Sequence, residues 1–250
     1  CYDASGSGWE ATVYGTTRYS NVHIERLAIR EVSVNSDNSQ VSVKQVGLEH
    51  GDVVASLDTF EKVYQAFMKL VYHRMDTAIR NKIKYYDLLH KIAPEPFLPT
   101  MVEDCIDKNL DMTNRGARYR IYSLFATGIS HCIDSLAAFR KLVYEDKTVT
   151  LAQAVDAIKK NWEGYEDLRQ RCLNRAPKYG NDNDEADELL VRFMSDFCNR
   201  ADELNRQIDW LWISAGVATF ENYPRFGHNA WASFDGRAAH EAFSSNDTPA

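Results

Sequence analysis

Apolar side chains recur at intervals of three and four residues over long stretches of the chain, a pattern that predicts amphipathic helices. The strongest pattern predicts a helix over 58–92, and Asp58 or Thr59 can cap its first turn. The apolar positions that share one face of this helix are Phe60, Val63, Tyr64, Phe67, Val71 and Met75. The proline-rich stretch PEPFLP at 94–99 ends the pattern, so the helix is expected to stop there.

Shorter helices are predicted along the rest of the chain. One is expected just after the proline-rich stretch, with Thr100 near its start and Cys105 inside it. The longer helical patterns cover 20–32, 129–145, 151–161, 163–174 and 185–212. Thr150 precedes the third of these and can cap it. The polar residues over 33–52 are predicted to form a loop.

Two short stretches are predicted to be strands. Residues 116–126 are rich in Tyr, Ile and Phe, which favour strands, and a second short strand is expected near 215–220. Because the first strand leads directly into the helical pattern at 129–145, the order favours a parallel α/β arrangement. No internal repeat, low-complexity segment or domain boundary interrupts the chain, so residues 1–250 are interpreted as one partial domain.

The composition is that of a globular protein and argues against two classes of partner. Hydrophobic residues make up 44% of the chain and charged residues 26%, a usual balance for a packed domain. The formal charge of -7 argues against a nucleic-acid surface, since phosphates are neutralised by basic patches. No stretch approaches the roughly 18 apolar residues that span a bilayer. We therefore expect neither nucleic acid nor a membrane among the partners.

The cysteines and histidines do not have the spacing of a metal site. The chain has 5 cysteines, no two of them spaced as C-x-x-C, and 7 histidines without an H-E-x-x-H pattern, so we predict no bound metal. An odd number of cysteines in a domain of this size indicates a reducing compartment, and we expect the cytoplasm. The cysteines expected to serve as small buried apolar residues are Cys105, Cys132, Cys172 and Cys198.

The two ends of the sequence do not resemble natural termini. The first residue is Cys1 instead of Met, and the last residues, SSNDTPA, resemble the middle of a loop. We therefore expect the sequence to be a piece of a longer chain.

Four segments, in this order, resemble the glycyl radical enzyme family, which includes pyruvate formate-lyase. They are DCIDKNLDMTNRGARY at 104–119, DSLAAFRKLVYE at 134–145, the stretch at 150–184 that ends in KYGNDND, and FGHNAWASFDGRAAHEAF at 226–243. Each motif alone is weak, but together, in this order and spacing, they identify the chain as a member of the family. Arg115 and His240 stand where the family has glycine, and Ala242 stands where it has proline.

The resemblance implies a ten-stranded α/β barrel, made of two half-barrels of parallel strands with helices outside. Residues 1–250 would be the helix-rich second half, a partial pyruvate formate-lyase-like barrel domain. In the family a finger loop carries a cysteine into the barrel, and its distance from the segment at 104–119 places Cys1 at that position. The glycyl radical lies on a C-terminal loop, and no R-V-S-G-Y-like segment occurs here, so we expect that domain to be absent and the isolated chain to be inactive.

The resemblance also assigns chemistry to the start of the chain. In the family the radical passes from glycine to the cysteine sulfur, and the thiyl abstracts a hydrogen atom from substrate, which makes Cys1 the candidate radical relay. Many members place Glu two residues after this cysteine as a general base, and Asp3 offers the same carboxylate with a shorter reach. The alternative for Asp3 is a loop carboxylate that caps nearby amides.

Arg18 is the candidate substrate-binding residue. It lies near the position where pyruvate formate-lyase keeps an arginine for its substrate carboxylate, and a guanidinium binds a carboxylate through two hydrogen bonds. The alternative for Arg18 is an ordinary surface arginine. The residues at 178–182 and the DGR triplet at 235–237 are interpreted as structural turns.

Together these features predict a glycyl radical lyase that cleaves a C–C or C–X bond of a small carboxylate or alcohol, by elimination or decarboxylation. Formate C-acetyltransferase, the activity of pyruvate formate-lyase, is the alternative within the family. The resemblance implies a homodimer, a radical S-adenosylmethionine activating enzyme as partner, and no cofactor in this chain, because the organic glycyl radical lies on the missing loop.

Two hypotheses from other classes begin from Cys1. One is a non-catalytic, lipoprotein-type binding protein with Cys1 lipidated and DASGSG as its tether. The other is an N-terminal-nucleophile hydrolase with Cys1 as the nucleophile. The first does not account for the ordered motifs at 134–145 and 178–184, and the second requires a sheet-rich fold, whereas this chain is mostly helical by pattern.

Overall fold

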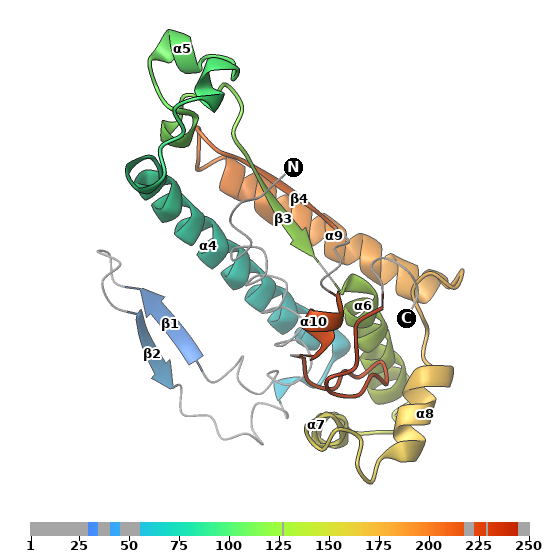
Figure 1. Cartoon of the computed structure of the whole chain (residues 1–250). Coiled ribbons are helices and arrows are strands. Elements are labelled where there is room, and N and C mark those ends of the chain that lie inside the picture. Colours follow the sequence, from blue (N-terminus) through green and yellow to red (C-terminus); the bar gives the residue numbers. More distant parts are fainter. Residues whose placement is uncertain are drawn as a thin grey trace.

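The described residues form a helix-rich α/β structure with two small sheets (Figure 1). The computed structural model describes residues 30–34, 41–45, 56–126, 128–217, 223–228 and 230–244.

The first sheet joins β1 (Arg30–Val34) and β2 (Val41–Gln45), which pair antiparallel with Arg30 opposite Gln45. The predicted helix over 20–32 is therefore wrong at its described end, and the loop predicted over 33–52 is wrong at both strands. In REVSV and VSVKQ, valine alternates with polar residues, a period of two that belongs to strands and outweighs the helical pattern before it.

The second sheet is parallel, as predicted, and joins β3 (Ile121–Ala126) to β4 (Trp212–Val217). The strand predicted over 116–126 begins only at Ile121, and the one predicted near 215–220 is displaced toward the N-terminus. Gly116 lies too close to the backbone of Leu110 to accept a side chain, and this tight turn precedes the strand.

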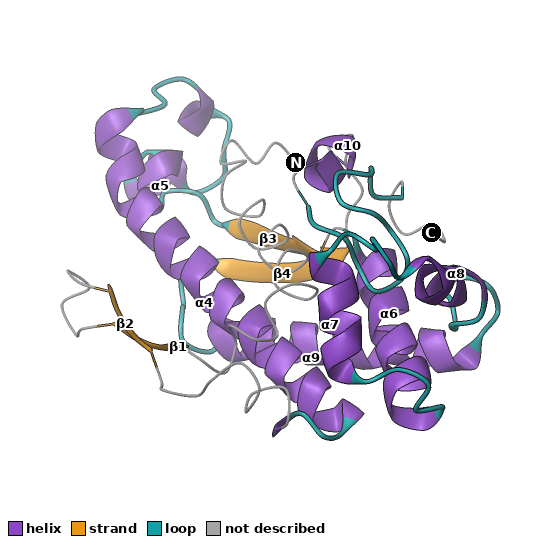
Figure 2. Ribbon diagram, turned by 90° about the horizontal axis from the view of Figure 1, so that it is seen from below, coloured by secondary structure: helices purple, strands orange, loops and turns teal. Residues whose placement is uncertain are grey.

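One face of the parallel sheet is covered by helices. Figure 2 shows α4 (Phe60–Ile92) and α9 (Asp184–Asn205) on the same side of the two strands. Residues of β3 and β4 that point to the helices are buried: Tyr122, Leu124 and Ile213. On the opposite face Ile121 and Trp212, which are register partners, are each 60% exposed.

The two long helices are joined by charged side chains as well as by the core. Arg192 on α9 donates hydrogen bonds of 2.7 and 2.8 Å to the Glu61 carboxylate on α4, and its guanidinium lies 3.8 Å from the Tyr64 ring centroid. Further along, Arg200 donates two 2.7 Å hydrogen bonds to the Asp76 carboxylate. These pairs lie near the surface, so their main effect is to fix how the helices align.

Helix α9 ends at Asn205, seven residues before the predicted end at 212. The Asn205 side chain accepts a 2.7 Å hydrogen bond from the Ile213 backbone N–H and donates one of 2.9 Å to the Ile213 carbonyl. These bonds fold the chain back at 206–211 and start β4. The apolar residues Ile208, Trp210 and Leu211, which extended the helical pattern, instead pack under the turn and strand.

The start of α4 agrees with prediction, but the single helix expected after the proline-rich stretch is wrong: Thr100 ends one short helix and Cys105 begins another. Thr59 caps α4, and Thr150 and Gln153 form a reciprocal capping box at α7 (Leu151–Lys159). The helix predicted over 129–145 is continuous but changes its winding, since α6 (Ile129–Ala138) is α-helical and η3 (Phe139–Glu145) is a π-helix. The shorter helices are η1 (Leu98–Thr100), α5 (Cys105–Lys108), η2 (Met112–Asn114), α6 (Ile129–Ala138), η3 (Phe139–Glu145), α7 (Leu151–Lys159), α8 (Glu166–Asn174) and α10 (Tyr223–His228).

Two apolar cores hold these elements together. The first lies between α4, α6, α9 and the covered face of the parallel sheet, and includes Tyr64, Met75, Leu124, Phe193 and Phe197. The second lies between η3, α7, α8 and the loop at 230–244. There Phe234 stacks on Phe139, with 4.3 Å between the ring centroids, and lies 6.0 Å from Trp162. The loop at 230–244 is thus packed into the body of the protein.

In the described part of the chain, no helix is both long enough and apolar enough to cross a membrane.

Replacing Phe193 tests the first core. Phe193 is 1% exposed and its ring lies 5.8 Å from Phe197 and 6.1 Å from Phe67. Phe193→Ala should lower the free energy of unfolding by about 3–5 kcal/mol, because it leaves a cavity that rigid neighbours cannot fill. Val191, on the same helix but 69% exposed, is the control, and Val191→Ala should change it by less than about 0.5 kcal/mol. Denaturant titration measures both, and an equal loss in the two variants would contradict the assignment of the core.

Candidate functional site

The predicted site residues Cys1, Asp3 and Arg18 lie outside the described residues, so their positions stay predictions. The structure describes what surrounds the C-terminal end of the parallel strands, where ligands bind in α/β folds. There β3 leads through Gly128, which has φ 74°, directly into α6.

Four polar side chains from three segments meet at the start of α6, and we call them the α6 polar cluster. His131 and Asp134 come from α6, Lys178 from the loop before α9, and Asp235 from the DGR triplet. All four are buried or nearly so, and Asp134 is 0% exposed. Because burying charge is costly unless it is paired, the arrangement of these groups is strongly constrained.

His131 links α6 to two residues of the loop at 230–244, Asp235 and Ser244. Its Nδ1 is hydrogen-bonded to Asp235 Oδ2, and its Nε2 lies 2.8 Å from the backbone nitrogen of Ser244. A backbone N–H can only donate, so Nε2 must be the acceptor and the ring proton lies on Nδ1. His131 is therefore a neutral imidazole that donates to the Asp235 carboxylate.

Lys178 contacts both aspartates of the cluster, Asp134 through its carboxylate and Asp235 through its backbone. Its Nζ donates a 2.9 Å hydrogen bond to the Asp235 backbone carbonyl and lies 3.5 Å from Asp134 Oδ2. The other oxygen of Asp134 accepts a 2.8 Å hydrogen bond from the Tyr179 backbone N–H. The interpretation of 178–182 as a structural turn is confirmed at Lys178 and Tyr179, whose hydrogen bonds fix this loop on α6.

The two carboxyl groups have opposite pKa shifts. Burial raises the pKa of Asp134 to about 6, and the charge of Lys178 offsets only part of that effect. Burial also acts to raise the pKa of Asp235, but the hydrogen bonds from His131 and Ser233 and the charge of Lys178 outweigh it and hold that pKa below its ordinary value. Asp235 is therefore ionised, and Asp134 is the carboxyl of the cluster that exchanges its proton near neutral pH.

The DGR triplet is a structural turn, as predicted. The Arg237 guanidinium donates hydrogen bonds to the backbone carbonyls of Trp231, Ala238 at 3.0 Å and Glu241 at 2.8 Å. Gly236 has φ 106°, and a Cβ on it would lie 2.5 Å from the Leu173 side chain, so no other residue fits there. Arg237 thus organises the loop from within and is not free to bind a ligand.

The described cysteines are structural. Burial raises the pKa of both Cys132 and Cys172 to about 12, so their thiols stay protonated and unreactive near neutral pH. Cys105 is also buried, while Cys198 is partly exposed and the predicted burial is wrong there.

The α6 polar cluster supplies Asp and His, and Ser130 and Ser244 lie beside it, but these groups cannot act as a hydrolytic triad. In such a triad the imidazole Nε2 accepts the proton of the serine hydroxyl. Here Nε2 of His131 is occupied by the Ser244 backbone N–H, and the Ser244 hydroxyl lies 2.9 Å from that of Ser130 instead. Ser130 is also 0% exposed, so no ester or amide substrate can reach it.

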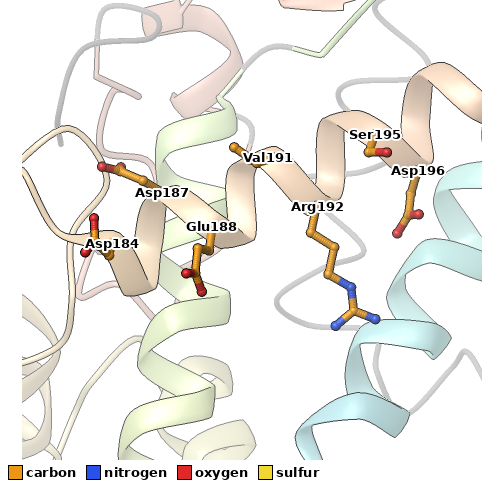
Figure 3. Close-up of a pocket in the computed structure, with 7 residues that line it drawn as sticks. All are labelled: Asp184, Asp187, Glu188, Val191, Arg192, Ser195 and Asp196. Carbon is orange, nitrogen blue, oxygen red and sulfur yellow. The ribbon is translucent and has the colours of Figure 1, made fainter.

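The hollows found on the described surface lie away from this cluster. One of about 460 Å³ lies along α9 (Figure 3), where Arg192 extends toward α4. Its lining is Asp184, Asp187, Glu188, Val191, Arg192, Ser195 and Asp196. Arg192 is paired with Glu61, and Asp196 accepts a 2.8 Å hydrogen bond from the Tyr64 hydroxyl. Another hollow of about 320 Å³ lies between residues 95 and 111.

The chain belongs to the pyruvate formate lyase-like family, whose model matches residues 1–223. It is 32% identical over 199 residues to trans-4-hydroxy-L-proline dehydratase of Clostridioides difficile, a match that covers 80% of this chain and 24% of that one. It is 28% identical over 246 residues to (2S)-3-sulfopropanediol dehydratase of Klebsiella oxytoca, covering 97% of this chain and 28% of that one. The predicted glycyl radical enzyme family is thereby confirmed.

Comparison with a solved structure shows that the similarity to this family extends to the fold. Hydroxyproline dehydratase from Clostridioides difficile, with trans-4-hydroxy-L-proline bound, matches with a TM-score of 0.72 and 27% identity. The match covers 90% of this chain and 28% of that one. The chain thus spans about a quarter of the length of the relatives it matches.

The sequence does not predict the α6 polar cluster as a unit, although three of its four members, Asp134, Lys178 and Asp235, lie in segments that the sequence analysis singles out. His131 was one of several scattered histidines, and Asp134 was part of the DSLAAF motif. One signal was available: every residue of α6 is buried, so a histidine and an aspartate inside such an apolar helix must have buried partners.

Replacing Asp134 tests the protonation state of the cluster. The pKa of Asp134 is about 6 in the fold against an ordinary value of 3.8. Its contribution to stability is therefore full below pH 3.8 and is lost as the pH rises through about 6. Asp134→Asn cannot ionise, so its stability relative to wild type should rise by up to about 3 kcal/mol between about pH 4 and about pH 7. Urea unfolding across this range measures the difference.

Glu61→Gln is the control for this prediction. The hydrogen bond from Arg192 lowers the pKa of Glu61, so wild type should gain stability over Glu61→Gln as the pH rises, the opposite trend. A difference between wild type and Asp134→Asn that is flat or falls with pH would contradict the raised pKa.

Proposed function

We propose that this chain is part of a glycyl radical lyase that eliminates a leaving group from a small polar substrate, with dehydration as the leading reaction. The observation that carries the proposal is the match to trans-4-hydroxy-L-proline dehydratase, which extends over 80% of the chain. The second relative, a sulfopropanediol dehydratase, supports the same class of reaction. The Cys1–Tyr2–Asp3 tripeptide adds a thiol and a carboxylate at the positions the reaction needs.

The proposal includes the fold of the whole enzyme. The chain would be the helix-rich second half of a ten-stranded α/β barrel, to which β3 and β4 contribute parallel strands. The exposed apolar pair Ile121 and Trp212 supports this, since parallel sheets in such folds are covered on both faces. The glycyl radical domain would lie in a part of the protein beyond these 250 residues.

Cys1 would be the atom-transfer group. The glycyl radical of the family supplies the unpaired electron. The Cys1 thiyl takes a hydrogen atom from a substrate carbon, which breaks one C–H bond and forms one S–H bond. After the leaving group departs, the same S–H bond returns a hydrogen atom to the product radical. An S–H bond is comparable in strength to an activated C–H bond, so both transfers are close to balanced.

Asp3 would be the proton acceptor for this elimination. Its carboxylate takes the proton of an O–H or N–H group on the radical carbon, and the carbon–oxygen bond of the leaving group on the neighbouring carbon then breaks. The proton taken by Asp3 passes to the departing hydroxide, which leaves as water. The alternative role of Asp3 as a loop cap predicts no such dependence on its charge.

Two alternatives remain as outcomes of the tests. Formate C-acetyltransferase activity would need pyruvate and coenzyme A and no carboxylate beside Cys1. A decarboxylating lyase would release carbon dioxide and no water. The family match disfavours a lipidated binding protein, and the helix-rich fold disfavours an N-terminal-nucleophile hydrolase.

The direct experiment is anaerobic activation of the full-length protein by a radical S-adenosylmethionine activating enzyme. Electron paramagnetic resonance should show a glycyl doublet, and the activated protein should then dehydrate one member of a panel that includes trans-4-hydroxy-L-proline, propane-1,2-diol and glycerol. The 250-residue chain alone should give no doublet. Turnover of pyruvate with coenzyme A, or carbon dioxide release, would replace the dehydratase assignment.

Cys1→Ser should leave the glycyl doublet intact and abolish turnover in the full-length protein. An O–H bond is too strong for a serine hydroxyl to replace the thiol as a radical relay. Product formation and the doublet are measured on the same sample. Cys198→Ser, at a partly exposed cysteine on α9, is the control, and it should keep both the glycyl doublet and the turnover. Turnover by Cys1→Ser would exclude Cys1 as the relay.

Asp3→Asn separates the two roles of Asp3. The change keeps the size of the side chain but removes the proton acceptor, and general-base catalysis contributes about 10²–10⁴-fold, so kcat should fall by that order. Substrate affinity should change much less. Asp3→Glu restores a carboxylate of the family's usual length and should recover most of the rate. A loss of only a few-fold in Asp3→Asn would reject the base and favour the loop cap.

A further inference from the structure

We propose that His131 is a positioning residue: as a neutral imidazole it binds both ends of the segment 235–244 and so fixes where the chain leaves the α6 polar cluster. We call the two hydrogen bonds of His131, to the Asp235 carboxylate and from the Ser244 backbone N–H, the His131 clamp. Nothing in the family match or the relatives' names assigns this role.

Asp235 and Ser244 each bind His131 through one group and a different residue through another group. Asp235 Oδ2 is bonded by Nδ1 of His131, while the Asp235 backbone carbonyl is taken by Lys178. The Ser244 backbone N–H is bonded by Nε2 of His131, and its hydroxyl is engaged with that of Ser130. The Phe243 ring, 5.4 Å from the imidazole, closes the site against water.

Only an imidazole with its proton on Nδ1 can make both bonds. A protonated ring would direct an N–H at the Ser244 N–H and lose that end of the clamp, while its bond to Asp235 would strengthen. The charged groups near the ring are Asp235 from the loop, which bonds it, Asp134 from α6, and Lys178 from the loop before α9. The Arg237 guanidinium lies over the neighbouring Phe243 ring.

The His131 clamp has its main effect at Ser244, because the turn at 235–237 is also held by other contacts. Phe234 is stacked on Phe139, and the Trp162 indole N–H donates a 3.1 Å hydrogen bond to the Arg237 carbonyl. Arg169 Nε donates a 2.7 Å hydrogen bond to the Gly236 carbonyl. Within the described residues, by contrast, the hydrogen bonds of Ser244 run to α6, through His131 and Ser130. Releasing His131 should therefore free the end at 244 while the turn at 235–237 stays in place.

The location gives this clamp a consequence for catalysis. The loop lies beside the start of α6, directly after the C-terminal end of β3 (Figure 1), the end at which α/β enzymes bind substrate. The cluster itself is buried and cannot touch substrate. His131 would thus act through the loop, so its loss should lower kcat more than it changes KM. This kinetic consequence rests on the proposed function, whereas the clamp itself does not.

Two variants of His131 separate the two ends of the clamp. Asn places an amide N–H₂ near the position of Nδ1, so His131→Asn keeps a donor to Asp235 and loses the acceptor for Ser244. Gln reaches the position of Nε2, so His131→Gln keeps an acceptor for Ser244 and loses the donor to Asp235. Hydrogen exchange followed by mass spectrometry, on the full-length protein before activation, reports on the amide of Ser244.

We expect exchange at Ser244 to be roughly 10-fold faster in His131→Asn and within about 3-fold of wild type in His131→Gln, as expected for loss or retention of one buried hydrogen bond. Peptides that cover 232–238 should stay protected in His131→Asn. In the activated enzyme, kcat should fall about 10-fold or more in His131→Asn and recover in His131→Gln, with KM within about 2-fold.

The wild-type protein provides a test that does not depend on whether the variants fold. An unprotected Ser244 amide in wild type would overturn the clamp, as would a ¹⁵N spectrum that shows the His131 proton on Nε2. Equal exchange in the Asn and Gln variants would also overturn it. Faster exchange in His131→Asn with unchanged kcat would overturn the positioning role, and this outcome differs from failure of the proposed function, in which wild type itself has no lyase activity.

Discussion

The pairing of buried charge at the start of α6 is the constraint on which the surrounding structure depends. Asp134 and Asp235 are buried in the same region, and Lys178 is the cation that contacts both residues. An unpaired carboxylate there would cost several kcal/mol, so α6, the loop before α9 and the DGR turn must come together for any of them to be stable. The neutral His131 adds a donor without adding a second positive charge.

This constraint explains which parts of the sequence carried the family resemblance. The DSLAAF, KYGNDND and DGR motifs lie far apart in the chain, and each contributes one member of the α6 polar cluster. Their resemblance to the family therefore reflects a shared scaffold. The chemistry is proposed for a different place, the Cys1–Asp3 tripeptide, which explains why the family could be confirmed while the substrate stays a proposal.

Local patterns predicted the helices and the parallel strands, because capping and apolar periodicity act within a few residues. The prediction failed where a distant contact decides the outcome: Asn205 ends α9 by bonding Ile213 across a turn, although the apolar pattern continues. In the candidate site, too, local motifs could be read from the sequence, whereas contacts between distant residues could not. Asp134, Lys178 and Asp235 lie within motifs, but His131 lies in none of them. Its hydrogen bond to Asp235 joins positions 104 apart, and no local pattern contains such a bond.

The parallel pairing of β3 with β4 has a consequence for folding during synthesis on the ribosome. Strand β3 ends at Ala126 and its partner begins at Trp212, so roughly 85 residues must be made before the sheet can form. At about 5–20 residues per second, β3 emerges some 4–17 s before its partner is made. During that interval the apolar side chains of β3 have helices α4 and α6 to pack against, but β4, its partner in the described part of the chain, is not yet made. Nascent β3 is therefore a natural binding target for chaperones.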